Sequence, residues 1–286
     1  NPEFLREWSA VWDFLNPDRI VCWIWNESSK KIMEEIYAPL SDKTQIIFTD
    51  VKSSEIIKYA ANAFLATKIS FINEIANFCE LSWWNIQDVS KWIWTDKRIW
   101  KEFLEAWIWY GWSCFPKDIQ ALIETWKDFN YNFQIIKSTH EVNKKQKIVL
   151  VEKLKKHIEL KDKNIWILWL AFKAKTDDIR DAASLEIIEE LINNWVRSIK
   201  VYDPVAMDNV KNYLNDKKMI EYKYNSYDVC EWIDALLIVT NWDEFKTLDL
   251  KKIKKVMNWN IIIDWRNIYK LSEMKNLWFI YESIWR

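Results

Sequence analysis

The chain has 286 residues, half of them hydrophobic, and its 41 basic and 42 acidic residues leave a formal net charge of −1. This length can supply one or two ordinary hydrophobic cores. A balanced charge offers no bulk attraction to nucleic acid or to a membrane surface. Every apolar run is interrupted well before the roughly 20 residues that span a bilayer. The sequence therefore predicts a soluble, cytoplasmic protein without nucleic-acid or membrane partners.

The four cysteines, Cys22, Cys79, Cys114 and Cys230, lie far apart along the chain. Their spacing contains no CxxC pair, so it indicates neither a zinc site nor a disulfide framework. The chain has only two histidines. We therefore expect neither a metal site nor histidine-based catalysis.

The composition is abnormal in one respect, because a single glycine stands beside 22 tryptophans. An average chain of this length would contain roughly 20 glycines. The tryptophans stand where glycine is usual: Trp195 and Trp278 each follow a helical segment and precede a strand, and residues 107–113 read as a glycine-rich loop. True tryptophans would follow a core face with helical or strand periodicity. We therefore hypothesise that most of them are UGA codons that the host reads as glycine, and that Trp242 is a genuine tryptophan.

The first segment, residues 1–50, is typical of the end of an α/β domain. It predicts a strand at 19–23, a helix at 28–37 and a second strand at 45–49. No strand, turn and helix precede these elements. We therefore expect that a part of a larger protein is missing before Asn1.

The middle segment, residues 51–160, is predicted to be helical. A long helix begins near Ser53, and apolar residues recur in it with helical spacing to about Cys79. Further helices are expected at about 85–91, 117–127 and 140–160. The charged stretch 153–163 is the expected boundary of this domain.

The last segment, residues 161–286, alternates between strands and helices. The expected strands are 165–170, 199–202, 235–240 and 260–263, and the expected helices are 184–193, 208–214 and 250–257. Such alternation predicts a parallel sheet covered on both faces. Ligands of these sheets bind beyond the carboxyl ends of the strands. Those ends carry the pairs 172–173, 202–203 and 240–241 and the segment 264–266.

Cys114 has the clearest chemical context among the polar residues. It follows the presumed glycine loop and precedes a helix start, where the helix N-terminus and Lys117 favour a thiolate nucleophile. An inert buried cysteine is the alternative. Lys58 and Asn62 share one face of the long helix and could hold an oxygen substituent together. An ordinary polar stripe is the alternative for that pair.

Carboxylates and arginines add weaker signals. Glu3 and Glu7 are also four residues apart and could act on water or bind hydroxyls, although carboxylates in a first helical turn are at least as common. Arg98 and Arg266 are candidate anion binders. None of these residues indicates a particular reaction by itself.

Six segments together resemble the UDP-glucose 6-dehydrogenase family once tryptophan is read as glycine. Residues 1–8 (NPEFLREW) look like its NPEFLxEG segment, 58–64 (KYAANAF) resemble its KxAANAF helix, 110–118 (YGWSCFPKD) match its GGSCFxKD loop, 171–173 (AFK) with 178–180 (DIR) match the start of its UDP-binding domain, and 264–266 (DWR) look like its closing DGR. The resemblance covers essentially the whole chain. It implies that residues 1–50 end an NAD-binding domain, that 51–160 form a central helical dimerisation domain, and that 161–286 form a Rossmann-like UDP-sugar domain.

The resemblance also implies a reaction, in which C6 of UDP-glucose is oxidised twice, from alcohol to aldehyde to acid. Two NAD are consumed, and a cysteine thioester lies between the two oxidations. Cys114 would be the nucleophile, and Lys58 with Asn62 would hold the C6 oxygen. Asp118 would relay protons through a bound water, and Glu3 would assist hydrolysis of the thioester.

Further contacts are implied in the same way. UDP-glucose would be contacted by Phe4, Leu5, Arg98, Phe103, Glu105, Tyr110, Gly111, Phe172, Lys173 and Arg266. NAD would be contacted by Glu7, Cys114, Lys117 and Arg180. The long central helix would build a homodimer, in which Arg98 reaches the site of the neighbouring subunit. Because most of the NAD site is missing, the chain alone is expected to be inactive.

Two alternatives remain. A related dehydrogenase would act on GDP-mannose or on a UDP-N-acetylamino sugar, although the first and second matching segments favour UDP-glucose. A non-catalytic dimerising or nucleotide-binding module belongs to a different class. The complete set of Lys58, Asn62, Cys114 and Asp118 argues against such a module, because it has no use for a nucleophile.

Overall fold

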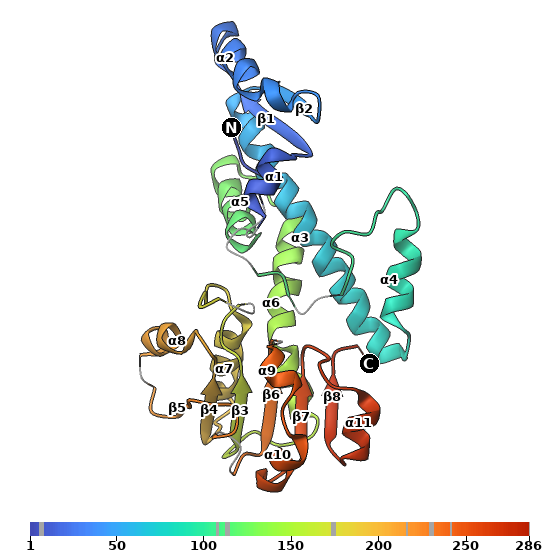
Figure 1. The fold of residues 1–286 in the computed structure, drawn as a ribbon, viewed down its shortest axis with the longest axis vertical. Coiled ribbons are helices and arrows are strands. Elements are labelled where there is room, and N and C mark those ends of the chain that lie inside the picture. The colour runs from blue at the N-terminus through green and yellow to red at the C-terminus, as the bar shows by residue number, and fades with distance from the viewer. Residues whose placement is uncertain are drawn as a thin grey trace.

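A computed structural model describes residues 1–5, 9–106, 109–111, 115–172, 176–215, 217–228, 232–240 and 242–285. The chain forms a small N-terminal lobe, a group of helices around two long ones, and an α/β domain with a six-stranded sheet (Figure 1). The long helices connect the lobe at one end of the molecule with the sheet at the other. The predicted combination of a helical middle and a parallel sheet is confirmed.

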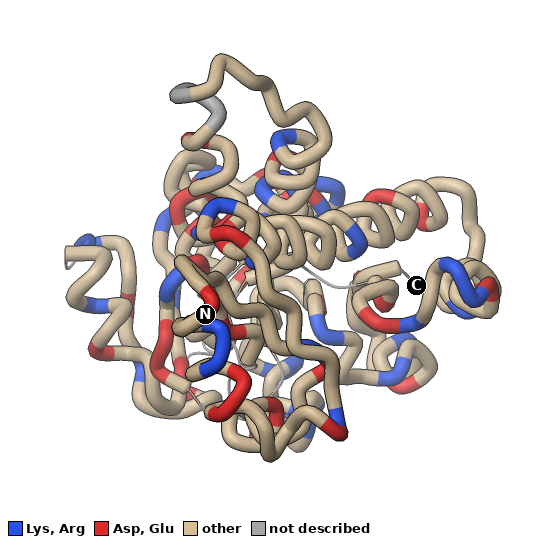
Figure 2. The backbone as a smooth tube through the Cα atoms, turned by 90° about the horizontal axis from the view of Figure 1, so that it is seen from above, with Lys and Arg blue, Asp and Glu red and all other residues tan. Residues whose placement is uncertain are grey.

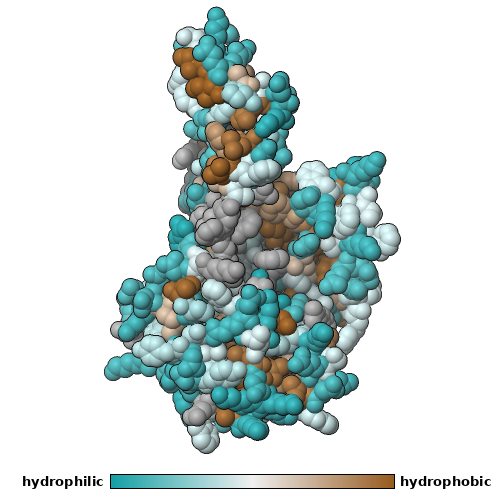
Figure 3. Space-filling model, viewed as in Figure 1, coloured by the Kyte–Doolittle hydropathy of each residue, from teal (hydrophilic) through white to brown (hydrophobic). Residues whose placement is uncertain are grey.

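The N-terminal lobe has little core of its own. Its elements are α1 (Ala10–Leu15), β1 (Arg19–Trp23), α2 (Glu27–Tyr37), the 3₁₀ helix η1 (Ala38–Leu40) and β2 (Gln45–Thr49). The two strands pair in parallel. The buried cluster of the lobe consists of Ile20, Cys22 and Leu40, whereas Ile32 and Ile36 on α2 are exposed. Apolar surface is accordingly visible on this lobe, at the top of Figure 3.

The helical middle is built around one helix of 32 residues. Its elements are α3 (Val51–Ser82), α4 (Ile86–Trp94), α5 (Phe115–Phe129) and α6 (Gln134–Lys155). The side chain of Asp50 caps α3 by accepting a hydrogen bond of 2.9 Å from the backbone N–H of Ser53. The helix ends at Trp83, whose backbone is left-handed with φ of 60°. A left-handed residue at this position is the usual way to end a helix, and it is usually glycine.

Polar side chains join α3 to α6 along their contact, in what we call the α3/α6 polar seam. Its members are Thr67, Ser70 and Asn77 on α3 and Thr139 and Gln146 on α6. The hydroxyls of Thr67 and Thr139 lie 3.1 Å apart, Ser70 donates to the carbonyl of Thr139 over 2.9 Å, and Asn77 donates to Gln146 over 2.8 Å. Hydrogen bonds are directional. The seam therefore fixes the register of one helix against the other.

The C-terminal domain is a doubly wound sheet. Its elements are β3 (Asn164–Leu168), α7 (Ala183–Asn193), β4 (Ser198–Tyr202), α8 (Met207–Leu214), β5 (Ile220–Tyr222), β6 (Ala235–Ile238), α9 (Asp243–Lys246), α10 (Leu250–Val256), β7 (Ile261–Asp264), α11 (Leu271–Asn276) and β8 (Ile280–Ser283). All strands are parallel, in the order β5-β4-β3-β6-β7-β8. Every residue of β6 and β7 is buried, as expected for strands covered on both faces.

The helical middle and the sheet share a core and a charge cluster. Leu150, Val151 and Leu154 of α6 belong to the same buried cluster as the strands. Beside them Lys153 is buried and pairs with Glu80 of α3 and with Glu282 of β8. We call Glu80, Lys153, His157 and Glu282 the interdomain charge cluster. The imidazole of His157 completes it at 2.7 Å from the carboxylate of Glu282.

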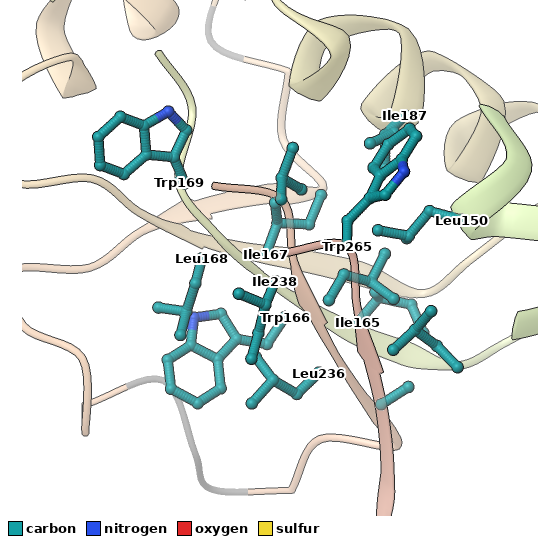
Figure 4. Close-up of a cluster of buried hydrophobic side chains, with 14 of the residues drawn as sticks. Leu150, Ile165, Trp166, Ile167, Leu168, Trp169, Ile187, Leu236, Ile238 and Trp265 are labelled. Atoms are coloured by element: carbon teal, nitrogen blue, oxygen red, sulfur yellow. The ribbon is translucent and has the colours of Figure 1, made fainter. Parts of the chain in front are cut away.

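Tryptophan occupies backbone positions that suit glycine. In the described part of the chain thirteen non-glycine residues have positive φ, and seven of them are Trp83, Trp100, Trp169, Trp195, Trp232, Trp278 and Trp285. A side chain in this region costs about 1–3 kcal/mol. Other tryptophans are packed into the sheet domain (Figure 4), and the indole N–H groups of Trp109, Trp166, Trp242 and Trp265 are buried without a hydrogen-bond partner. The left-handed backbones are what the recoding hypothesis expects. The unpartnered indoles do not distinguish recoded positions, because Trp242, expected to be genuine, shares this feature.

The surface carries charges of both signs. Lysine and arginine alternate with aspartate and glutamate along the backbone in Figure 2. In the part of the chain that the structure describes, no helix has both the length and the apolarity to cross a bilayer. The balanced formal charge of the sequence is thus also dispersed in space.

Candidate active site

A cavity of about 500 Å³ lies where the helical middle meets the sheet domain. It is lined by Ile69, Lys101, Glu102, Phe103, Glu105, Trp109, Tyr110, Gly111, Phe115, Phe172 and Arg266. Phe172 and Arg266 follow β3 and β7, so the cavity adjoins the carboxyl ends of the strands, where ligands of such sheets bind. Its volume is typical of pockets for small ligands. Six of the ten predicted substrate-binding residues share this lining: Phe103, Glu105, Tyr110, Gly111, Phe172 and Arg266.

Arg266 provides the cavity with a half-buried positive charge. Burial lowers the pKa of Arg266 to about 10, against the opposing effect of the Asp264 carboxylate. Asp264 holds the turn after β7, because it accepts hydrogen bonds from the backbone N–H of Arg266 at 2.7 Å and from the hydroxyl of Tyr281 at 2.6 Å. A guanidinium that is costly to bury is stabilised by an anion. The cavity is therefore suited to a negatively charged ligand.

Two backbone segments form opposite walls of the cavity and meet at the only glycine in the sequence. A Cβ atom on Gly111 would lie 2.9 Å from Nε1 of Trp109 and 3.0 Å from the ring of Phe172. Such distances are too short for a carbon contact, so a larger residue would push the walls apart. Gly111 is required here for close approach.

The wall that carries Phe172 is held by Asp203 at the end of β4. The buried carboxylate of Asp203 accepts backbone N–H bonds of 2.9 and 3.1 Å from residues 170–171, and two bonds of 2.8 Å from residues 205–206. An acidic residue at the end of the second strand often binds a ribose in dinucleotide-binding sheets. Here its acceptor sites are used by four amides, so it supports the loop instead.

Asn62 and Asp118 meet in the helical middle. Asn62 lies on α3, Asp118 lies in the first turn of α5, and the amide of Asn62 donates to the carboxylate of Asp118 over 2.6 Å. Both side chains are buried. Phe115, the first residue of α5, lines the cavity. The pair of predicted catalytic residues is therefore one helical turn from the cavity wall.

Lys58 lies one turn before Asn62 on α3 and faces the start of the chain. Its ammonium donates to the carbonyl of Glu3 and lies 3.7 Å from the Glu3 carboxylate. It also lies 5.5 Å from the ring centre of Phe4. The structure thus brings Lys58 to Glu3 and Phe4, two residues of the predicted site that lie 55 and 54 positions before it in the sequence.

The remaining described candidates lie outside the cavity. Leu5 donates its backbone N–H to the Glu3 carboxylate over 2.8 Å. Arg98 is largely exposed and pairs with Asp96 at 3.0 Å. Lys117 is exposed on α5. Arg180 is also mostly exposed, and its guanidinium pairs with Asp178 at 2.7 Å.

Three predicted site residues, Glu7, Cys114 and Lys173, lie outside the described residues. The two ends of the segment that contains Cys114 are described. Tyr110 and Phe115 are both buried, and their rings pack edge to face with centres 6.2 Å apart. The described part therefore fixes where this segment leaves and rejoins the core.

Some residues of the site were not anticipated from the sequence. Ile69, Lys101 and Glu102 line the cavity, and no motif marks them. Phe115 also lines it, and the resemblance had already placed residues 114–117 at the NAD site. Asp203 was noted at a strand end, but its hydrogen bonds with the neighbouring loop depend on the folded structure.

A parallel sheet with a cavity at the carboxyl ends of its strands places the chain in the class of doubly wound α/β proteins, whose ligands bind at that edge. Models of three domains of one family match successive parts of the chain: the NAD binding domain at residues 1–41, the central domain at 52–145 and the UDP binding domain at 166–271. The chain belongs to this family, the UDP-glucose/GDP-mannose dehydrogenase family.

Individual relatives agree with the family models. The UDP-glucose 6-dehydrogenase of Rickettsia conorii is 43% identical over 286 residues, which cover 99% of this chain and 66% of that protein. The UDP-glucose 6-dehydrogenase TuaD of Bacillus subtilis is 42% identical over 287 residues, covering 100% of this chain and 61% of that protein. The solved UDP-glucose dehydrogenase of Pyrobaculum islandicum superimposes with a TM-score of 0.84 at 30% identity, covering 99% of this chain and 62% of that one. The chain thus spans slightly less than two thirds of these relatives.

Proposed function

We propose that this chain is the substrate-binding and catalytic part of an NAD-dependent dehydrogenase that oxidises UDP-glucose to UDP-glucuronate. The observation that carries the proposal is that the cavity lined by predicted substrate-binding residues lies beside the pair of predicted catalytic residues Asn62 and Asp118. Helix α5 begins at Phe115 in the wall of the cavity, and one turn later it presents Asp118 to Asn62. The names of the relatives in Rickettsia conorii and Bacillus subtilis support UDP-glucose as the substrate.

The cavity suits the parts of a nucleotide sugar. Arg266 provides the charge for a diphosphate. Phe103, Tyr110 and Phe172 provide aromatic surfaces for the uracil and sugar rings. Glu105 provides an acceptor for sugar hydroxyls. Arginine, aromatic rings and a carboxylate in one cavity are the groups that a UDP-sugar requires.

The chemistry is assigned to the polar residues beside the cavity. Lys58 and Asn62 hold the C6 oxygen while its proton passes to a water bound by Asp118 and C6 loses a hydride. The thiolate of Cys114 then adds to the C6 aldehyde, and loss of a second hydride leaves a thioester. Water attacks the thioester with help from Glu3, the carbon–sulfur bond breaks, and the products are a carboxylate and the free thiol.

NAD, when bound, accepts the hydride of each oxidation. The match of residues 1–41 to an NAD binding domain supports a dinucleotide beside the N-terminal lobe. The exposed cations of Lys117 and Arg180 fit a pyrophosphate by their charge. Nucleotide sugars and NAD are metabolites of the cytoplasm, so the proposed reaction places the protein there.

The proposed assembly is a homodimer through α3. Phe64, Phe71 and Phe78 recur on this helix at intervals of seven residues, and each is at least half exposed. Residues seven apart lie on one face of a helix, so the three rings form an apolar stripe suited to a second copy. Arg98 is also exposed. Its position at the surface is compatible with a role in the site of the partner.

The decisive experiment replaces the proposed nucleophile. The protein to assay is the full-length enzyme with the amino acids that its own host inserts, which we call the native-coded enzyme. It should release two NADH for each UDP-glucose. Cys114→Ser should abolish the formation of UDP-glucuronate, because the second oxidation loses its covalent route. The matched control is Cys79→Ser, since Cys79 is buried in α3, and it should change stability more than turnover.

Three other outcomes would contradict parts of the proposal. A Cys114→Ser enzyme that still released two NADH per sugar near the wild-type rate would overturn the thioester route. Faster turnover of GDP-mannose or of a UDP-N-acetylamino sugar would overturn the substrate. Tight UDP binding by the native-coded enzyme without any NADH production would instead identify a non-catalytic nucleotide-binding module.

A further inference from the structure

A buried asparagine of α6 pairs with both backbone polar groups of one residue in the cavity wall. The backbone N–H of Tyr110 donates to Oδ1 of Asn143 over 2.7 Å, and Nδ2 of Asn143 donates to the carbonyl of Tyr110 over 2.9 Å. Asn143 is 4% exposed and Tyr110 is 2% exposed. A side-chain amide here does what a neighbouring strand does in a sheet, because it satisfies a donor and an acceptor together.

The residue held in this way is a junction of the site. Tyr110 and the adjacent Gly111 line the cavity, and Gly111 lies against Phe172 of the opposite wall. The ring of Tyr110 packs on Phe115 at the start of α5. The backbone of Tyr110 is thus fixed to α6, and its side chain is fixed to α5.

The helix that provides Asn143 is itself fixed to the helix that carries the proposed catalytic residues. Asn143 lies between Thr139 and Gln146, the two α6 members of the α3/α6 polar seam, at a spacing that places the three side chains on one face. The partners of Thr139 and Gln146 are on α3, which also carries Lys58 and Asn62. One set of hydrogen bonds therefore joins α3 to α6, and a second set on the same face of α6 joins that helix to the cavity wall.

We infer that Asn143 is a positioning residue, which sets the Tyr110–Gly111 wall at a fixed distance from the proposed catalytic face of α3. The inference rests on the proposed function for its effect on turnover. It assigns to Asn143 no contact with substrate. Asn143 acts through the wall, which contacts the sugar and so keeps C6 close to the proposed catalytic residues.

A pair of substitutions distinguishes positioning from a general contribution to folding. Asn143→Ala leaves both Tyr110 groups unpaired, and we expect kcat/KM for UDP-glucose in the native-coded enzyme to fall on the order of 10- to 100-fold. Asn143→Asp keeps the acceptor and regains a donor only when the new carboxyl is protonated. The ratio of its kcat/KM to that of the wild type should therefore rise as the pH falls. The matched control is Asn164→Ala at the start of β3, away from the cavity. Asn164 also uses both amide atoms, because it donates to the carbonyl of Trp232 over 3.0 Å and accepts from the hydroxyl of Ser198 over 3.0 Å.

Amide hydrogen exchange tests the same inference without turnover. Asn143→Ala should speed the exchange of residues 109–111, and Asn164→Ala should not. Unchanged exchange at 109–111, or an Asn143→Ala enzyme as active as Asn164→Ala, would overturn the inference. If exchange responds as expected but the wild type does not oxidise UDP-glucose, the proposed function fails and the positioning of the wall stands.

Discussion

At the scale of single residues, a positive φ angle at several tryptophan positions favours glycine over any residue with a Cβ atom. Trp195 follows α7 with φ of 57°, and its side chain is 76% exposed. The exposed indole gains little burial to offset the cost of a left-handed backbone, which is about 1–2 kcal/mol for a residue with a Cβ. Trp278 after α11 repeats this arrangement with φ of 60° and 80% exposure. Glycine takes the same backbone without that cost.

The protein made by its own host should therefore contain glycine at these positions. Mass spectrometry of tryptic peptides should show glycine at Trp83, Trp195 and Trp278, and the gene should carry UGA there. The control is Trp242, where the hypothesis predicts UGG and tryptophan. Each Trp→Gly replacement at an exposed left-handed position should raise the free energy of unfolding by about 1 kcal/mol. Peptides with tryptophan at all of these positions would end the recoding hypothesis.

The residues of the site divide by whether a local pattern marks them. Those within the matching segments, such as Asn62, Asp118 and Phe172, could be named from the sequence because the reaction requires their chemistry at a fixed spacing. Asn143 and Asp203 could not be assigned a role in this way. Each is a single polar residue without a motif, and its partner is 33 or 32 positions away in the chain, at Tyr110 or Ala171.

At the scale of elements, the sequence predicts helices and strands best where one face is apolar. The strands at 19–23 and 45–49 were predicted with the observed bounds. Helix α6 begins at Gln134, whereas the sequence predicts a start at His140. The prediction is late because the inward face of α6 carries the polar residues Thr139, Asn143 and Gln146, which hide the apolar periodicity. The edge strand β5 is not among the predicted strands, whereas a strand after Trp278 is predicted and corresponds to β8. Edge strands are short and partly exposed, so they lack a continuous apolar run.

The interdomain charge cluster gives the junction of α3, α6 and β8 a defined pH dependence. Burial acts to raise the pKa of Glu282, but the hydrogen bond from His157 and the charges of Lys153 and Lys156 outweigh it, so the pKa lies below its ordinary value. A carboxyl whose pKa is lower in the folded state stabilises the fold above its unfolded pKa. This contribution is lost as the pH falls through the folded pKa.

Glu282→Gln should therefore lower the free energy of unfolding by roughly 2 kcal/mol at pH 7, and the difference should shrink as the pH is lowered below about 4. Urea unfolding at pH 7 and at about pH 3 measures it. The control is Glu34→Gln, which removes a partner of Lys30 from an exposed pair on α2. A loss of stability that is equal at pH 7 and about pH 3 would show that the Glu282 carboxylate acts through packing alone.

At the scale of the whole molecule, α3 organises the protein with three different faces. One face carries Lys58 and Asn62 at the proposed site, and another forms the α3/α6 polar seam. The third carries the apolar stripe of Phe64, Phe71 and Phe78. A helix of 32 residues can therefore link the chemistry to the proposed assembly without an intervening loop.

Phe71→Glu should convert the proposed dimer of the native-coded enzyme into monomers, because it places a charge in the centre of the apolar stripe. Sedimentation velocity over a range of concentrations would measure the change. The matched control is Phe129→Glu, since Phe129 is equally apolar and 76% exposed at the end of α5. A Phe71→Glu protein that sediments as the wild type does would remove α3 from the interface.

The left-handed turns also have a consequence for the movement of this gene between organisms. If the codons are UGA, a host that reads UGA as a stop would end translation at or before Trp8 and would make neither the helical middle nor the sheet domain. A host that reads UGA as tryptophan would place an indole at each of the seven described left-handed positions that carry Trp. We expect neither of these hosts to make a functional enzyme from the gene. Because these turns require glycine, the gene can yield the glycine-containing protein only in a host whose translation apparatus reads UGA as glycine.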